Sequence, residues 1–152
     1  MKNGLRVGIV GIVTDYVNIW EKEENLKGIH ITDPFEAAKN ALAQMKEQTD
    51  LTICIYHGGF ECDLESGETL SQTTENVGYR ICKELDFDIL LTGHQHMSVP
   101  GRDISGTYTV QPCDNAKEYQ YLEVTMTDHE KSIRSELRQS DAAKGTVLAD
   151  KY

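Results

Sequence analysis

Short, largely apolar segments alternate along the chain with segments whose apolar residues recur three or four positions apart. The apolar segments cover residues 5–13, 51–56 and 88–91, and such runs are typical of strands buried on both faces of a parallel sheet. The segments with helical spacing cover residues 34–45 and 75–85. This order of strands and helices predicts right-handed parallel crossovers and therefore an α/β fold.

The first predicted helix has a clear start in the sequence. Asp33 is a natural N-cap, Pro34 fits the first helical position, and Glu36 completes a pattern like a capping box. We expect one face of this helix to pack on the sheet through four apolar residues: Phe35, Ala38, Leu42 and Met45.

The sequence changes character after Gly106. Residues 107–112 and 119–126 are rich in β-branched and aromatic residues, and because they lie close together we expect them to form antiparallel strands. From residue 128 onward the chain is polar with a weak helical pattern. We therefore predict a domain over residues 1–127 and a linker or tail over residues 128–152.

Composition limits the classes of partner. The formal net charge is −10, which disfavours binding of a polynucleotide through a basic face, although metal ions could supply local positive charge for a small phosphate ester. No apolar run approaches the roughly 18 residues of a membrane span, so no membrane insertion is expected. The N-terminal residues lack the features of a secretory signal, and the sequence leaves the localisation open.

The chain has four cysteines, and none of them lies in a CxxC motif. Cys54 and Cys82 occur within apolar patterns, so we expect both to be buried thiols. The spacing does not resemble a disulfide framework, which favours a reducing compartment.

Three of the five histidines follow predicted strands. His57 follows the strand over residues 51–56, whereas His94 and His96 follow the strand over residues 88–91. Ligands of open α/β sheets bind outside the carboxyl ends of the strands, so all three imidazoles are expected at one edge of the sheet. In extended chain, residues two apart point to the same side roughly 6.5–7 Å apart. Neighbouring imidazoles could then each reach one of two metals roughly 3.5–4 Å apart.

Glycines surround these histidines. Gly93 precedes His94, while Gly58 and Gly59 follow His57, and each is expected to let the backbone turn tightly. These features favour metal or phosphate chemistry over a purely structural role for the histidines.

Other polar and aromatic residues are interpreted structurally. We interpret Asp15 and Asp63 as turn residues, with a place near the histidine edge as the alternative, and Trp20 as an anchor of its loop on the core. His30 and His129 lack a comparable context and are interpreted as surface residues.

The motifs "YHGG" at residues 56–59 and "TGHQH" at residues 92–96, followed by "PG" at residues 100–101, resemble the second half of a calcineurin-like metallophosphoesterase domain. The chain is most similar to the branch that contains 5′-nucleotidases, UDP-sugar hydrolases and 2′,3′-cyclic-nucleotide 2′-phosphodiesterases/3′-nucleotidases. The resemblance covers about residues 5–127 and implies part of a metallophosphoesterase sandwich: parallel strands with crossover helices, then a short antiparallel β part.

The resemblance also implies a site. His57 and His94 correspond to ligands of the second metal, and His96 corresponds to a ligand of the first. The complete family site holds two divalent ions, with Mn, Zn or Fe as candidates, and a bound hydroxide attacks the phosphorus of a nucleotide or cyclic nucleotide. No residue is assigned a catalytic role beyond metal binding.

The sequence departs from the family pattern in one important respect. The Asp-x-His, Gly-Asp and Gly-Asn motifs that supply the remaining family ligands do not occur in it. We therefore expect the carboxyl-terminal half of a catalytic domain, incomplete as an isolated chain, and leave open whether the chain alone is an enzyme. The alternatives are a non-catalytic remnant and a weak metal-binding or interaction module. A half domain also exposes a sheet edge, which predicts a homodimer, and the parent family is usually exported or bound to the cell wall.

Overall fold

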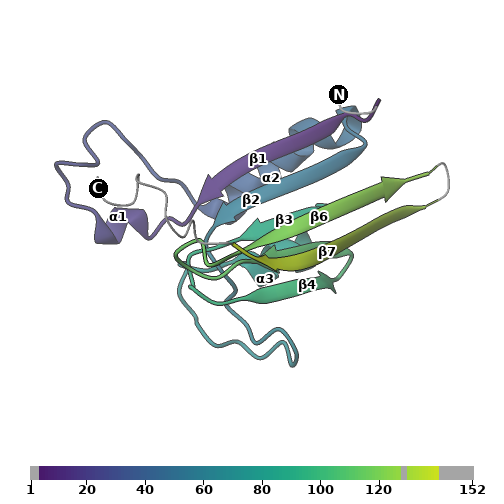
Figure 1. The fold of residues 1–152 in the computed structure, drawn as a ribbon. Helices are drawn as coiled ribbons and strands as arrows, with labels where there is room; N and C mark the ends of the chain where they lie inside the picture. The colour runs from purple at the N-terminus through teal and green to yellow at the C-terminus, as the bar shows by residue number, and fades with distance from the viewer. Residues whose placement is uncertain (1–3, 128–129, 141–152) are drawn as a thin grey trace, which may run out of the picture.

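The computed structural model describes residues 4–127 and 130–140. Its main element is a five-stranded sheet with the strand order β1-β2-β3-β5-β4 (Figure 1). Four strands run parallel, and β4 pairs antiparallel with β5 at one edge. The strands span Val7–Val13 (β1), Leu51–His57 (β2), Ile89–Thr92 (β3), Val99–Ile104 (β4) and Thr107–Gln111 (β5). The α/β fold with parallel strands and crossover helices is thus confirmed.

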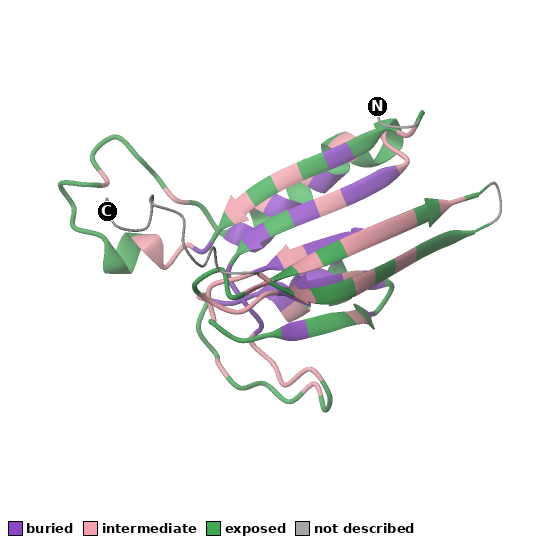
Figure 2. Ribbon diagram, in the orientation of Figure 1, coloured by how far each residue is buried: buried purple, intermediate pink, exposed green. Residues whose placement is uncertain are grey.

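Two helices, α2 (Pro34–Met45) and α3 (Gly78–Glu84), pack on one face of this sheet. The backbone N–H of Glu36 donates to Asp33 Oδ1 at 2.9 Å, which confirms Asp33 as the N-cap of α2. Because successive strand residues alternate between the faces, the core forms between the helices and every second strand residue (Figure 2). Its members include Phe35, Ala38, Leu42, Cys54, Tyr56, Ile81, Leu85 and Leu90.

Two shorter elements complete the helical part of the fold. A one-turn helix, α1 (Val17–Trp20), lies in the long excursion between β1 and α2, and a short 3₁₀ helix, η1 (Lys46–Gln48), follows α2. Helix α3 begins at Gly78, three residues later than the sequence pattern suggested. Among the described residues, no helix is long and apolar enough to span a membrane.

The carboxyl-terminal part of the described chain forms a separate antiparallel hairpin. Strand β6 (Glu118–Met126) pairs with β7 (Lys131–Gln139), and the two make a two-stranded sheet. The expected pairing of residues 107–112 with residues 119–126 is therefore wrong, because β3 and β4 already occupy both edges of β5. The weak helical pattern after residue 128 is also wrong for residues 131–139. The hairpin crosses the boundary expected at residue 127, and the division into domains remains a prediction.

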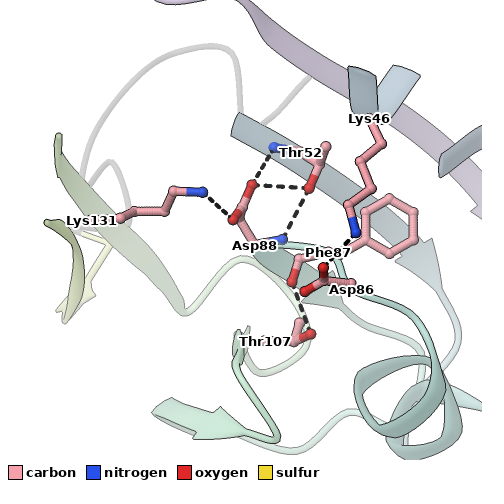
Figure 3. A network of polar contacts seen from close by, with 7 residues as sticks. All are labelled: Lys46, Thr52, Asp86, Phe87, Asp88, Thr107 and Lys131. Carbon is pink, nitrogen blue, oxygen red and sulfur yellow. Dashed lines mark hydrogen bonds and ion pairs between the residues drawn. The ribbon is translucent and has the colours of Figure 1, made fainter. Parts of the chain in front are cut away.

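A polar network fastens the hairpin to the main sheet (Figure 3). Asp88, just before β3, accepts hydrogen bonds from the backbone N–H and the Oγ1 of Thr52 at 2.7 and 3.0 Å, and its other oxygen pairs with Lys131 of β7. Further along the hairpin, Tyr108 Oη and Ser135 Oγ lie 3.0 Å apart. These contacts place β6 and β7 against the sheet face that the helices leave uncovered.

The part of that face formed by β1 and β2 stays open. Val7, Ile9, Val13 and Ile55 project from it, and Ile9 is 60% exposed. Burial of β1 on both faces, as the continuous apolar run over residues 5–13 suggested, is therefore not found in the described structure.

Candidate functional site

The parallel pairing of β2 with β3 brings two of the three predicted site histidines together. His57 is the last residue of β2, and His94 lies two residues beyond the end of β3. The ring centroids of His57 and His94 are 5.3 Å apart, with an angle of 56° between the ring planes. The carboxyl edge of the sheet thus holds a pair of neighbouring imidazoles, as the strand-end argument predicted for these two residues.

The third histidine lies elsewhere. The backbone of His94 and His96 is left-handed, with φ of 73° and 54°, so the chain turns instead of extending between them. The extended H-x-H geometry is therefore wrong. His96 is exposed and lies near Asp114, whose pKa is lowered mainly by its hydrogen bond from Lys117. Metal binding by His96 remains a prediction.

Close packing requires glycine at two of the three positions, Gly58 and Gly59. A Cβ atom at Gly58 would lie 2.0 Å from the Tyr56 ring, and one at Gly59 would lie 2.1 Å from the Gln95 side chain. Gly93 has neither a positive φ nor a close neighbour. The left-handed backbone conformation occurs at His94 instead. The expected tight turn at Gly93 is therefore displaced by one residue.

Amide side chains connect the two loops that carry His57 and His94. Asn76 Oδ1 accepts the buried N–H of Gly59 at 2.7 Å. Gln95 binds both backbone groups of Phe60: its Oε1 accepts the N–H at 2.8 Å, and its Nε2 donates to the carbonyl at 2.9 Å. The backbone of both loops is thereby fixed relative to the sheet edge.

His94 is surrounded by partners that the sequence did not reveal. Its Nε2 lies 2.9 Å from Glu75 Oε1, and its ring lies 5.0 Å from the Trp20 ring at an angle of 32°. Trp20 is half exposed and makes an edge contact with Tyr16, so its expected role as an anchor on the core is wrong. Glu75 falls within the second predicted helical segment, residues 75–85, whereas it lies in the connection that leads to α3.

Of the two aspartates interpreted as turn residues, Asp63 makes local contacts, whereas Asp15 contacts a residue 59 positions away in the sequence. Asp63 Oδ1 accepts from the N–H and the Oγ of Ser66 at 2.7 and 2.8 Å, and these hydrogen bonds lower the pKa of Asp63. Asp15 accepts from Thr74 Oγ1, with a shorter distance of 2.9 Å. His30 is exposed, as expected, and His129 lies outside the described residues.

Comparison with known proteins assigns the family. No protein-family model matches the chain. A 2′,3′-cyclic-nucleotide 2′-phosphodiesterase/3′-nucleotidase of Salmonella typhimurium is 29% identical over 103 residues, which cover 66% of this chain. A trifunctional nucleotide phosphoesterase of Bacillus subtilis is 30% identical over 105 residues, or 67% of this chain. The crystal structure of a Staphylococcus aureus protein named as a 5′-nucleotidase, solved in complex with α-ketoglutarate, superposes on 99% of this chain with a TM-score of 0.87 and 30% identity.

The chain belongs to this family of nucleotidases and cyclic-nucleotide phosphodiesterases. It spans only part of its relatives: 15% of the Salmonella protein, 7% of the Bacillus protein and 30% of the Staphylococcus chain. The resemblance of the "YHGG" and "TGHQH" motifs to metallophosphoesterases is thereby confirmed at the level of the family.

The metal that such a family uses requires more donors than this sheet edge offers. His57 and His94 present imidazole nitrogens, and Glu75 adds a carboxylate that is engaged with His94. Among the described residues, no group of three or more His, Cys, Asp or Glu side chains is arranged to hold a metal ion. Open catalytic zinc sites usually have three protein ligands. The described residues therefore do not form a metal centre on their own.

Proposed function

We propose that this chain is part of a metal-dependent phosphoester hydrolase that acts on nucleotides or 2′,3′-cyclic nucleotides. The observation that carries the proposal is the contact between His57 and His94 at the carboxyl edge of a parallel sheet. The relatives support the substrate class, since those compared above are named nucleotidases, cyclic-nucleotide phosphodiesterases and nucleotide phosphoesterases. In this proposal His57, His94 and His96 are metal ligands, and manganese, zinc and iron are the candidate ions.

When present, divalent ions would supply positive charge for the phosphate and an activated water molecule. The residues of this chain position the imidazoles: the strand ends place His57 and His94, and Asn76 and Gln95 hold their loops. Because the described donors are too few, further ligands would come from polypeptide beyond them.

A chimaera tests this proposal. The matching segment of the Staphylococcus aureus protein is replaced by this chain, which aligns with it over 99% of its length. We expect hydrolysis of AMP or 2′,3′-cyclic AMP that requires added manganese or zinc. His94→Ala should abolish this activity, whereas the exposed control His30→Ala should not. A folded chimaera without turnover, or one insensitive to His94→Ala, would refute the proposal.

A non-catalytic interaction module is the second candidate, and the shortage of metal donors among the described residues favours it. It predicts that replacing His57, His94 and His96 with alanine changes no ligand binding. The same chimaera separates the two candidates, because such a module would not restore hydrolysis.

We also propose that a second copy of this chain pairs with the β1 edge. β1 is the edge strand of the main sheet in the described structure, and it contains no charged residue or proline to discourage pairing. The exposed Ile9 and Val13 of β1 lie beside the exposed Ile55 of the neighbouring strand β2, so pairing would also cover apolar surface. Analytical ultracentrifugation should show a dimer that Ile9→Lys dissociates. A monomer at high concentration, or a dimer unaffected by Ile9→Lys, would contradict the proposal.

A further inference from the structure

We propose that the exposed surface of the Trp20 ring is a stacking platform for the base of a nucleotide whose phosphate lies at the carboxyl edge of the sheet. The inference rests on the proposed function, because that function places the phosphate ester at this edge. It adds a contact for the part of the substrate that does not react. No motif of the sequence assigned such a contact to Trp20.

The neighbours of the Trp20 ring leave much of its surface free. The His94 ring lies against it with centroids 5.0 Å apart and an angle of 32° between the planes. Tyr16 contacts the ring at 5.8 Å and 68°, and a ring that stands so steeply covers little of a flat surface. Trp20 therefore remains 50% exposed although it lies directly beside a histidine of the candidate site.

Core packing does not explain why a tryptophan occupies this position. Helix α1 contains no buried residue, and its neighbouring Ile19 is 67% exposed. A half-exposed indole gives up part of the stabilisation that burial of its large apolar surface would provide. A flat aromatic surface that stays accessible beside polar groups is the arrangement on which nucleic-acid bases stack.

Hydrogen bonds hold the segment that carries Trp20 in place. The N–H of Thr14 donates to the carbonyl of His57 at 3.0 Å, so the excursion after β1 begins fixed to the end of β2. The side-chain amide of Asn18 donates to the carbonyl of Ile31 at 3.0 Å, which ties α1 to the residues that precede α2. A ring that is already positioned loses little freedom when a ligand binds to it.

The charge near Trp20 distinguishes the two ends of a nucleotide. The residues that follow Trp20 include three glutamates, Glu21, Glu23 and Glu24, and Lys22 is the only basic residue among them. This negative segment repels a phosphate but not a neutral base. The base is therefore expected at Trp20, and the phosphate at the two imidazoles.

A purely structural role of Trp20 makes a different prediction. If the ring only shields His94 from water, its removal disturbs that histidine and impairs every phosphate ester to the same extent. A stacking platform serves only those esters that carry a base. AMP and ribose 5-phosphate, which lacks the base, therefore separate the two roles.

The first test uses the full chain without added metal. Trp20 is the single tryptophan of the chain, so its fluorescence reports ligands of this ring alone. We expect saturable quenching by AMP and by adenosine, and none by ribose 5-phosphate. The quenching should exceed that of N-acetyltryptophanamide by the same compounds. Quenching no stronger than that of the free indole compound would refute the platform.

The second test measures kinetics in the chimaera described above. Trp20→Ala should raise KM for AMP about 5- to 150-fold with little change in kcat, because stacking on the unreacting base is lost. Its kcat/KM for ribose 5-phosphate should stay unchanged. Trp20→Phe should retain most of the affinity for AMP, and the exposed control Ile19→Ala all of it. An equal loss for AMP and ribose 5-phosphate would show that Trp20 only shields His94, and would overturn the inference.

The two tests separate this inference from the proposed function. Quenching requires neither metal nor turnover, so a folded chimaera that hydrolyses nothing refutes the proposed function while the quenching still decides on the platform. Conversely, a chimaera that hydrolyses AMP with the same KM in the wild type and in Trp20→Ala supports the proposed function and refutes the platform.

Discussion

At the scale of single residues, three side chains hold the two histidine loops at the sheet edge. Asn76 and Gln95 bind backbone groups of the loop after His57, and Glu75 binds the His94 ring. These contacts join segments that are far apart in sequence. The strand-end rule predicted that His57 and His94 meet, but no local pattern identified Glu75 or Asn76, because their partners are set by tertiary structure.

Asn76→Ala tests the importance of these contacts for stability. The change leaves the buried N–H of Gly59 without its acceptor, and we expect the free energy of unfolding to fall by about 1–3 kcal/mol. Urea denaturation measures the change, with the exposed Asn40→Ala on α2 as the control. An Asn76→Ala variant as stable as the wild type would show that the loop does not depend on this hydrogen bond.

The two buried cysteines, Cys54 and Cys82, give a further prediction at the residue scale. It raises the pKa of both the Cys54 and the Cys82 thiol to about 12, and the two side chains are fully enclosed in the core. Both thiols are therefore expected to resist alkylation by iodoacetamide in the folded protein and to react after unfolding. Mass spectrometry after brief labelling checks this, and rapid modification of Cys54 in the native chain would contradict the packing of β2.

At the scale of elements, regular hydrophobic patterns predicted α2 and the strands β1, β2 and β3, but they did not predict the edge strand β4. The pattern of α2 was sufficient because Asp33, Pro34 and the apolar face all agree with one another. The β7 strand was missed because charged residues interrupt its alternation and its pairing with β6 provides most of its order. The sequence also could not show that β5 would already be paired on both sides.

The anchor of the hairpin offers a matched pair of variants. Asp88 accepts two hydrogen bonds from Thr52 and pairs with Lys131, whereas Asp86, two residues away, makes an exposed ion pair with Lys46 (Figure 3). We expect Asp88→Ala to cost about 1.5–3 kcal/mol, because hydrogen bonds to a charged group are lost. Asp86→Ala should cost less than about 1 kcal/mol. Equal costs in urea denaturation would mean that the network does not anchor β7.

Another ion pair connects the starts of β1 and β2 and gives a pH dependence. Hydrogen bonds from the Arg6 side chain and backbone lower the pKa of Asp50 from 3.8 to about 2. A lowered carboxyl pKa adds stability that is complete above 3.8 and is lost as the pH falls toward about 2. Arg6→Met should reduce this part of the acid sensitivity, measured as the free energy of unfolding against pH. An unchanged acid profile would contradict the assignment.

At the scale of the whole molecule, the described chain has too few metal donors at its histidine edge and an apolar sheet face that remains exposed. The sheet edge carries two neighbouring imidazoles but no group of three metal donors among the described residues, and the face of β1 and β2 is open and apolar. Both features agree with a chain that spans 30% of the homologous Staphylococcus chain. The family of the chain was predictable from two short motifs, and the lack of the other family motifs had predicted that some metal ligands are missing from the chain.

A zinc-soaked crystal of the chimaera, in which the Staphylococcus aureus protein supplies the remaining polypeptide, tests the central claim most directly. The account predicts an anomalous peak at the carboxyl edge of the sheet, within roughly 2.0–2.1 Å of a ring nitrogen of His94 and of His57. Zinc that binds elsewhere and leaves both imidazoles untouched would contradict the assignment of this sheet edge as the functional site.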